Sequence, residues 1–185
     1  MSGRTTVEQS TDPRHRFDLL FQAHYEAIYR YCARRLGRTE AEDAAADVFA
    51  VAWRRLDEMP AGDASRAWLY GVAYRVIGNR FRGRRRQAGL ASKLETSVRD
   101  TGPQPVSDPA VELIYRALGG MSASDQELLR LSSWDGLSRR EIAHVLSIKE
   151  NAVDQRLYRA RARLWARVDD LHQETSTSKA KEAST

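Results

Sequence analysis

Side chains of types that can hydrogen-bond to nucleic acid are concentrated in one stretch of the second half of the chain, LSRREIAHVLSIKENAVDQRLYRARARL. Four of them fall on the sides of a predicted helix that its apolar residues leave free: Gln155, Arg156, Arg159 and Arg163. Guanidinium and amide groups bond to phosphates and to base edges. The residue types and their spacing therefore make nucleic acid the first partner to consider.

Two short helices are predicted to carry these side chains. Ser138 and Glu141 have the spacing of a capping box, which starts a helix. The chain then breaks around Ser147 and Ile148, and a second helical pattern begins near Glu150. The buried faces of the two helices are predicted from their apolar residues: Ile142, Ala143, Val145 and Leu146 in the first, and Val153, Leu157, Ala160 and Leu164 in the second. This is a helix-turn-helix pattern; a helical hairpin with a solvated arginine face is the alternative.

A second basic stretch lies in the first half, where no carboxylate occurs between Asp63 and Glu95. It holds eight basic residues: Arg66, Arg75, Arg80, Arg82, Arg84, Arg85, Arg86 and Lys93. Such a strip would hold a phosphate backbone. Aromatic residues are interleaved with it, and exposed rings can stack on unpaired bases: Trp68, Tyr70, Tyr74 and Phe81. For Trp68, packing in the core is an equally good interpretation.

The composition agrees with a DNA-facing protein and gives no sign of catalysis. The 185 residues carry a formal net charge of +5. No apolar run is long enough for a membrane span or a secretory signal, so we expect a cytoplasmic protein. Cys32 is the sole cysteine, and the four histidines are scattered. We therefore expect no metal site, no cofactor and no enzymatic activity.

The helical periodicity predicts an all-α fold of two small domains joined by a flexible linker. A helix is predicted from Arg16 to Leu36, ending at Gly37. Thr39 and Glu42 predict a capping box for a helix to about Glu58, with Ala41, Ala45, Val48, Phe49, Ala52, Trp53 and Leu56 on its buried face. A third helix is predicted to start after Asp63 or Ser65.

The second domain is predicted to begin after a stretch rich in glycine and proline. Asp108 followed by Pro109 predicts a helix start, and Ser124 with Glu127 predicts another. The tail lacks apolar residues and is predicted to be disordered. The expected divisions are a disordered N-terminus over 1–13, a domain over 14–88, a linker over 89–108, a domain over 109–171 and a disordered tail over 172–185.

Several motifs resemble those of group IV (extracytoplasmic function, ECF-type) RNA polymerase sigma factors of the sigma-70 family. In the first domain they are Ala41-Glu42-Asp43, Val48-Phe49, Ala52-Trp53 and Ala67-Trp68-Leu69; in the second they span Asp135 to Ala143 and Val153 to Leu164. The two domains would then be sigma region 2 and sigma region 4. The resemblance implies a factor that binds RNA polymerase core, reads the minus-35 and minus-10 promoter elements, and assists melting.

The resemblance also implies roles for particular residues. Contacts with the beta-prime clamp helices of the polymerase core are expected from Asp43, Asp47 and Arg54. Contacts with the minus-10 element are expected from Asp63 and Ser65 in a loop, and from Trp68, Arg75, Asn79, Arg80, Arg82, Arg84, Arg85 and Arg86. Contacts with the minus-35 element are expected from Asp154, Gln155, Arg156, Arg159 and Arg163. The beta flap and an anti-sigma factor are the other expected partners.

The chain departs from the family pattern at two of these places. The family often has asparagine at the position of Arg75, so the minus-10 base preference does not carry over. Ser147 stands where the turn usually has glycine, which implies a slightly different turn. Two other classes of function stay open: a dimeric helix-turn-helix regulator that never engages polymerase, and a sigma-like decoy that sequesters a partner.

Overall fold

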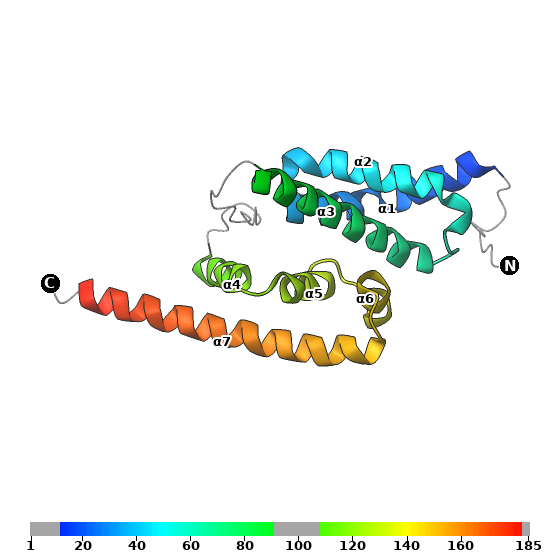
Figure 1. Ribbon diagram of the computed structural model, residues 1–185. Helices are drawn as coiled ribbons and strands as arrows, with labels where there is room; N and C mark the ends of the chain where they lie inside the picture. Colours follow the sequence, from blue (N-terminus) through cyan, green and yellow to red (C-terminus); the bar gives the residue numbers. More distant parts are fainter. Residues whose placement is uncertain (1–11, 91–107, 183–185) are drawn as a thin grey trace. The chain divides into compact units, whose positions relative to one another are not determined.

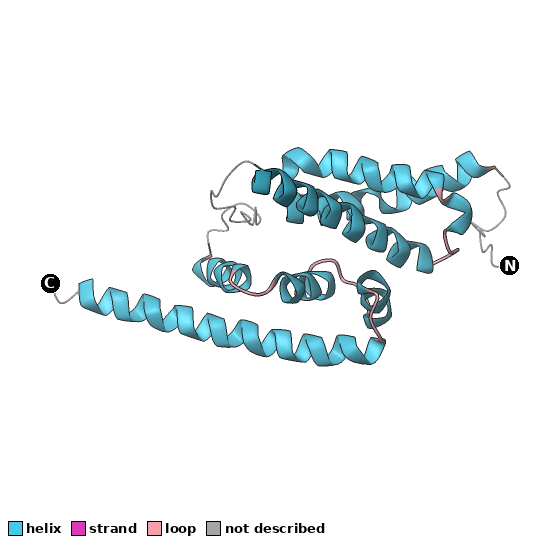
Figure 2. Cartoon of the chain, viewed as in Figure 1, coloured by secondary structure: helices cyan, strands magenta, loops and turns pink. Residues whose placement is uncertain are grey.

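The computed structural model of the chain describes residues 12–90 and 108–182, which form helices joined by short loops (Figure 1). Within these two ranges no residue lies in a strand (Figure 2), so the all-α prediction is confirmed. The chain divides into two compact units. The first contains α1, α2 and α3, and the second contains α4, α5, α7 and the greater part of α6.

The first unit consists of α1 (Pro13–Leu36), α2 (Arg38–Arg54), a short 3-10 helix η2 (Leu56–Glu58) and α3 (Ala64–Leu90). α1 begins three residues earlier than the apolar pattern predicted, because the Asp12 side chain caps it by accepting a hydrogen bond from the Arg14 N–H at 3.0 Å. It ends where predicted. Gly37 has a φ of 83°, and its N–H donates to the Ala33 carbonyl.

Small side chains let the three helices of the first unit approach one another closely. α1 packs on α2 and α3, and α2 also packs on α3. Four alanines of α2 are almost completely buried: Ala41, Ala44, Ala45 and Ala52. Tyr31 of α1 meets Tyr70 of α3 edge-on, with ring centroids 5.2 Å apart. Burying one large apolar side chain contributes about 1.5–3 kcal/mol, so this core accounts for much of the unit's stability.

Three expectations for α2 are wrong. The helix starts at Arg38, directly after Gly37, with no side-chain cap, so the predicted capping box of Thr39 and Glu42 does not form. It ends at Arg54 and not near Glu58, because the backbone leaves helical geometry at Arg55 and continues as η2. Trp53, predicted to be buried, is 45% exposed.

The second unit contains α4 (Pro109–Gly119), α5 (Ala123–Ser133), most of α6 (Arg139–Leu146) and α7 (Glu150–Glu182). The helix start at Asp108 and Pro109 is confirmed, since the Asp108 carboxylate accepts from the Ala110 N–H at 2.9 Å. The cap predicted at Ser124 is wrong by two residues. α5 is capped by Ser122, whose hydroxyl accepts from the Asp125 N–H at 3.2 Å.

α7 is the longest helix that the structure describes, and both α4 and α5 pack along it. It continues to Glu182, so the predicted disorder from residue 172 is wrong as far as that residue. Residues 172–182 contain no glycine or proline, and their Glu, Lys, Gln and Ala residues favour a helix. Most of the expected linker (89–108) and N-terminal segment (1–13) lies outside the described residues. Among the residues described, no helix has both the length and the hydropathy needed to cross a membrane.

Candidate nucleic-acid interface

The predicted capping box at the start of α6 is confirmed. The Ser138 hydroxyl accepts a hydrogen bond from the Glu141 N–H at 3.3 Å. In return the Glu141 carboxylate accepts from the Ser138 N–H at 2.7 Å. The two bonds fix where α6 begins, and Ile142 and Val145 are then buried on its inner face.

The turn between α6 and α7 is closed by backbone hydrogen bonds despite the absence of glycine. The Ile148 N–H donates to the Ala143 carbonyl at 3.0 Å. Ser147 has a φ of 54°, in the left-handed region that glycine normally occupies. The sequence therefore keeps the tight helix-turn-helix connection at the expense of some backbone strain.

α7 presents a polar outer face opposite its buried residues. Val153 and Ala160 are fully buried, and Leu157 nearly so. The first four turns expose polar and aromatic side chains on the other sides, among them Asp154, Gln155, Arg156, Tyr158, Arg159, Arg161 and Arg163. Side chains near the N-terminus of a recognition helix are the ones that reach base edges. The arrangement suits a helix that enters the major groove.

Asp154 is paired with the helix that precedes it. Arg139 is the first residue of α6, and its guanidinium donates a hydrogen bond of 2.5 Å to the Asp154 carboxylate. Both side chains are more than half exposed. The hydrogen bond and the attraction of Asp154, with a smaller contribution from Glu150, raise the pKa of Arg139.

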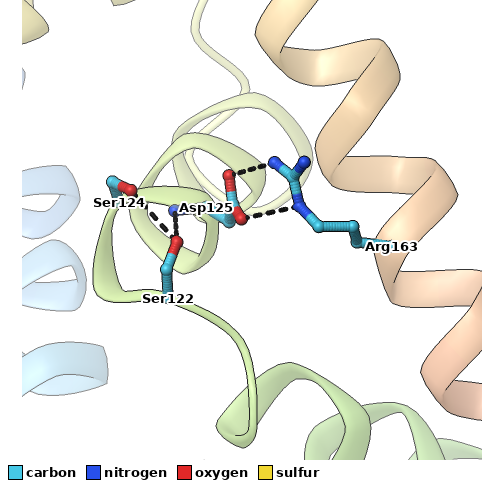
Figure 3. A network of polar contacts seen from close by, with 4 residues as sticks. All are labelled: Ser122, Ser124, Asp125 and Arg163. Carbon is cyan, nitrogen blue, oxygen red and sulfur yellow. Dashed lines mark hydrogen bonds and ion pairs between the residues drawn. The ribbon is translucent and has the colours of Figure 1, made fainter.

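Arg163 points toward α5 (Figure 3). Its guanidinium forms two hydrogen bonds to the Asp125 carboxylate, at 3.0 and 2.8 Å. This pair lowers the pKa of Asp125, whose side chain is only 16% exposed. One turn later, the Arg167 guanidinium donates to the Ala117 carbonyl near the end of α4, at 3.2 Å. Arg163 therefore makes a contact between helices, and its expected minus-35 contact stays a prediction.

The basic strip lies on α3 except for Lys93, which is outside the described residues. Its exposed members are Arg75, Arg82, Arg84, Arg85 and Arg86, with exposed Asn79 among them, and Arg66 and Arg80 are half-buried. Two arginines pair with carboxylates of α2. Arg80 contacts Asp47 at 2.5 Å, and Arg84 contacts Glu40. α2 therefore neutralises part of the strip and fixes the direction of two of its side chains.

Two candidate base-binding side chains lie at the start of α3, Asp63 as the last residue of the loop and Ser65 as the second residue of the helix, and they have different surroundings. Asp63 is exposed, whereas Ser65 is buried and donates a hydrogen bond to the Gly62 carbonyl at 2.8 Å. Trp68, in the first turn and a half of α3, is only 8% exposed. The core interpretation of Trp68 is therefore favoured, because a buried ring offers no face to a base.

The outer face of α2 carries the candidate polymerase contacts. Asp43, Asp47 and Arg54 are all exposed, and Asp47 is the one that pairs with Arg80. On the side of α2 that faces α1 lies a row of aromatic rings. Phe17 of α1 contacts Trp53 of α2 with centroids 5.2 Å apart, and the row continues with Phe21, Tyr25, Tyr29 and Phe49.

The histidine, cysteine and acidic side chains of the described residues are dispersed. Within residues 12–90 and 108–182, no three His, Cys, Asp or Glu side chains gather as metal ligands would. His24 is half-buried, and burial together with the nearby charge of Arg66 lowers its pKa. A neutral, packed histidine follows, as expected for a side chain on an apolar helix face.

Two family models match the chain. Sigma-70 region 2 matches residues 20–87, and Sigma-70 region 4 matches residues 111–164. The chain is also 30% identical over 166 residues to the RNA polymerase sigma factor CnrH of Cupriavidus metallidurans, covering 83% of this chain and 86% of that protein. This chain belongs to the ECF sigma factors of the sigma-70 family. The resemblance found in the motifs is confirmed, and the chain is an RNA polymerase sigma factor.

Other relatives and solved structures agree with this assignment. The sigma factor is 29% identical to the ECF sigma factor SigL of Mycobacterium tuberculosis, over 76% of this chain and 82% of SigL. A solved structure of CnrH with the cytosolic domain of CnrY matches with a TM-score of 0.57 and 27% identity, covering 86% of this chain and 91% of that one. The fold also matches RpoE of Bartonella quintana, in complex with the anti-sigma factor NepR (TM-score 0.64, 22% identity, 83% and 96% covered).

The structure of this sigma factor brings together most of the predicted site residues on two surfaces, α3 and α7, but it also shows contacts that the sequence did not reveal. Pairing of Arg139 with Asp154 joins residues 15 positions apart, and pairing of Asp125 with Arg163 joins residues 38 positions apart. No local spacing rule signals such pairs. Tyr158 was also missed. It is 77% exposed, and its position one turn after Asp154 is a signal that helical spacing offered.

Proposed function

We propose that this sigma factor binds RNA polymerase core and reads two promoter elements, the minus-35 element with α7 and the minus-10 element with α3 and the loop before it. The observation that supports this proposal most is that one chain carries two separate basic surfaces. One is the exposed outer face of a helix-turn-helix, and the other is an α3 strip in which no acidic residue occurs.

For the minus-35 element, the candidate readers on α7 are Gln155, Arg159 and Tyr158. Gln can pair with adenine and Arg with guanine in the major groove, and an aromatic ring offers apolar contact to a thymine methyl group. Arg156 and Arg161 are candidate phosphate contacts. Arg163 is not included, because its guanidinium bonds to Asp125.

For the minus-10 element, Arg75 and Asn79 share one exposed face of α3 at a spacing of four residues. The arginines from Arg82 to Arg86 would hold phosphates beside them. The polar loop before α3, with exposed Asp63, would hydrogen-bond a base that has left the stack once the duplex opens. Capturing such a base would assist melting, because the opened strand is stabilised.

For the polymerase, we propose that the exposed polar face of α2 docks on the beta-prime clamp helices through Asp43, Asp47 and Arg54, and that the second unit contacts the beta flap. The sigma factor would act in the cytoplasm, without chemistry of its own. We also propose an anti-sigma factor as a partner, supported by the solved relatives, since CnrH is seen with CnrY and the Bartonella RpoE with NepR.

Run-off transcription by bacterial core polymerase on a genomic promoter pool, with the start sites mapped, tests this function. Adding the sigma factor is expected to produce new starts that share two spaced, asymmetric elements. An Asp43→Arg variant should produce fewer starts, because a charge reversal on α2 weakens core binding, whereas Asp169→Arg on the exposed face of α7 should not affect assembly with core. DNA binding without any new start would favour the helix-turn-helix regulator instead.

A further inference from the structure

Asp154 is a poor side chain for the position that it occupies. It lies on the exposed face of α7, one residue before Gln155, where a recognition helix meets DNA. A carboxylate there approaches two strands of phosphates, and like charges repel most strongly where water is partly excluded. Direct reading of a cytosine amino group would offset this repulsion at one base only.

The contact with Arg139 resolves this conflict. Arg139 is the first residue of α6, and the first helix of a helix-turn-helix crosses the DNA backbone. Its Nη1 atom lies 2.5 Å from the Asp154 carboxylate, and the side chains of the pair are 57% and 53% exposed. The pair of Arg163 and Asp125 differs from it, since the Asp125 side chain is only 16% exposed and accepts two hydrogen bonds from Arg163. The pair of Arg139 and Asp154 lies on the surface shared by the start of α6 and the start of α7.

We propose that Arg139 is a promoter phosphate contact and that Asp154 is its positioning residue, not a reader of a base. A guanidinium has five N–H donors, and Asp154 occupies one of them at Nη1, which leaves the others for phosphate oxygens. The pair also cancels the negative charge of Asp154 at the DNA surface. This inference rests on the proposed reading of the minus-35 element by α7.

Five variants of the full chain test the pair: Arg139→Gln, Asp154→Asn, the double variant of these two, and Arg140→Gln with and without Asp154→Asn as matched controls. Arg140→Gln removes the same charge from the next residue of α6 but leaves the pair of Arg139 and Asp154 intact. Each variant is assembled with core polymerase, and assembly is measured first. The affinity of each holoenzyme for a promoter mapped with the wild-type chain is then measured at several salt concentrations.

The two roles of Asp154 predict opposite results. If the pair acts as proposed, Arg139→Gln lowers promoter affinity about tenfold and reduces the salt slope by about one, because a phosphate contact is lost and a carboxylate is left unpaired. Adding Asp154→Asn then restores part of the affinity, about threefold, since the repulsion is removed. Asp154→Asn alone changes affinity less than about fivefold, the range of an exposed ion pair. When Asp154→Asn is added to Arg140→Gln, promoter affinity does not recover.

Other outcomes overturn the inference. These are an unchanged salt slope in Arg139→Gln, a double variant no better than Arg139→Gln, or a loss of discrimination at one base pair in Asp154→Asn. The last result would make Asp154 a direct reader. Failure of the wild-type chain to direct any promoter-specific start would overturn the proposed function itself, and is distinguishable because it precedes every comparison of variants.

Discussion

At the scale of single residues, the sequence predicts best those contacts that are local in the chain. The capping box of Ser138 and Glu141 forms because both partners belong to the same turn. The pairing of Arg163 with Asp125 could not be predicted, since a basic residue on a recognition helix has the same type and spacing whether it faces phosphate or another helix. Only the packing of α5 on α7 distinguishes the two.

Replacing Ser147 by glycine should stabilise the second unit. Its φ of 54° is unfavourable for a residue with a Cβ atom and costs about 1 kcal/mol, which glycine avoids. We expect Ser147→Gly to raise the free energy of unfolding by about 1 kcal/mol in urea denaturation, and Ser147→Ala to bring no gain. A lower stability of Ser147→Gly would show that the backbone here is not strained.

The pair of Asp125 and Arg163 should make stability depend on pH in the acid range. The pKa of Asp125 is lower in the folded state than in the unfolded state. The ionised carboxylate therefore contributes its full share to the free energy of unfolding above the unfolded-state pKa, near about 4. This share is lost as the pH falls through the folded-state pKa. Asp125→Asn should cost about 1–2 kcal/mol at neutral pH. The difference in free energy of unfolding between Asp125→Asn and the wild type should shrink as the pH is lowered below about 4.

Two matched measurements separate this role of Arg163 from a DNA contact. Arg163→Gln should lower the free energy of unfolding about as much as Asp125→Asn, and the double variant should lose little more, because one interaction is removed in each case. The salt slope of promoter binding should stay unchanged in Arg163→Gln. A salt slope reduced by about one in Arg163→Gln would show that Arg163 contacts a DNA phosphate.

At the scale of helices, periodicity predicts which faces are buried but not where a helix ends. α1, α3 and α7 bury most of the apolar residues that their spacing indicates, but Phe21 of α1 is 37% exposed and Leu164 of α7 is half-buried. α2 shows the limit of such patterns. Gly37 both ends α1 and precedes α2, so the connection leaves no room for a cap at Thr39. Trp53 falls on an apolar pattern, yet it is exposed and contacts Phe17 at the border of the core.

The close approach of α2 to its neighbours depends on its alanines. Ala45 is fully buried, and enlarging it to leucine should force the helices apart at a cost of about 1–3 kcal/mol. Ala46 is exposed and provides the matched control, since Ala46→Leu should stay within about 0.5 kcal/mol of the wild type. Thermal unfolding of both variants checks this. Equal stability of the two would contradict the packing described for α2.

At the scale of the whole molecule, function follows from two helical units on one chain. Binding of one unit to the promoter raises the effective concentration of the other at its own element, so two weak contacts act together. The sequence predicts this organisation well, because two separate motif blocks flank a stretch rich in proline and glycine. It predicts individual contacts less well, because the partners of Asp47 and Asp154 lie on other helices.

The central claim is that α7 and α3 read different promoter elements, and run-off transcription from a mapped promoter with single base substitutions tests it most directly. We expect Gln155→Ala and Arg159→Ala to become insensitive to substitutions in the upstream element while still discriminating in the downstream one. Arg75→Ala and Asn79→Ala should show the reverse. Discrimination that is unchanged in all four variants, or lost at the opposite element, would contradict the account.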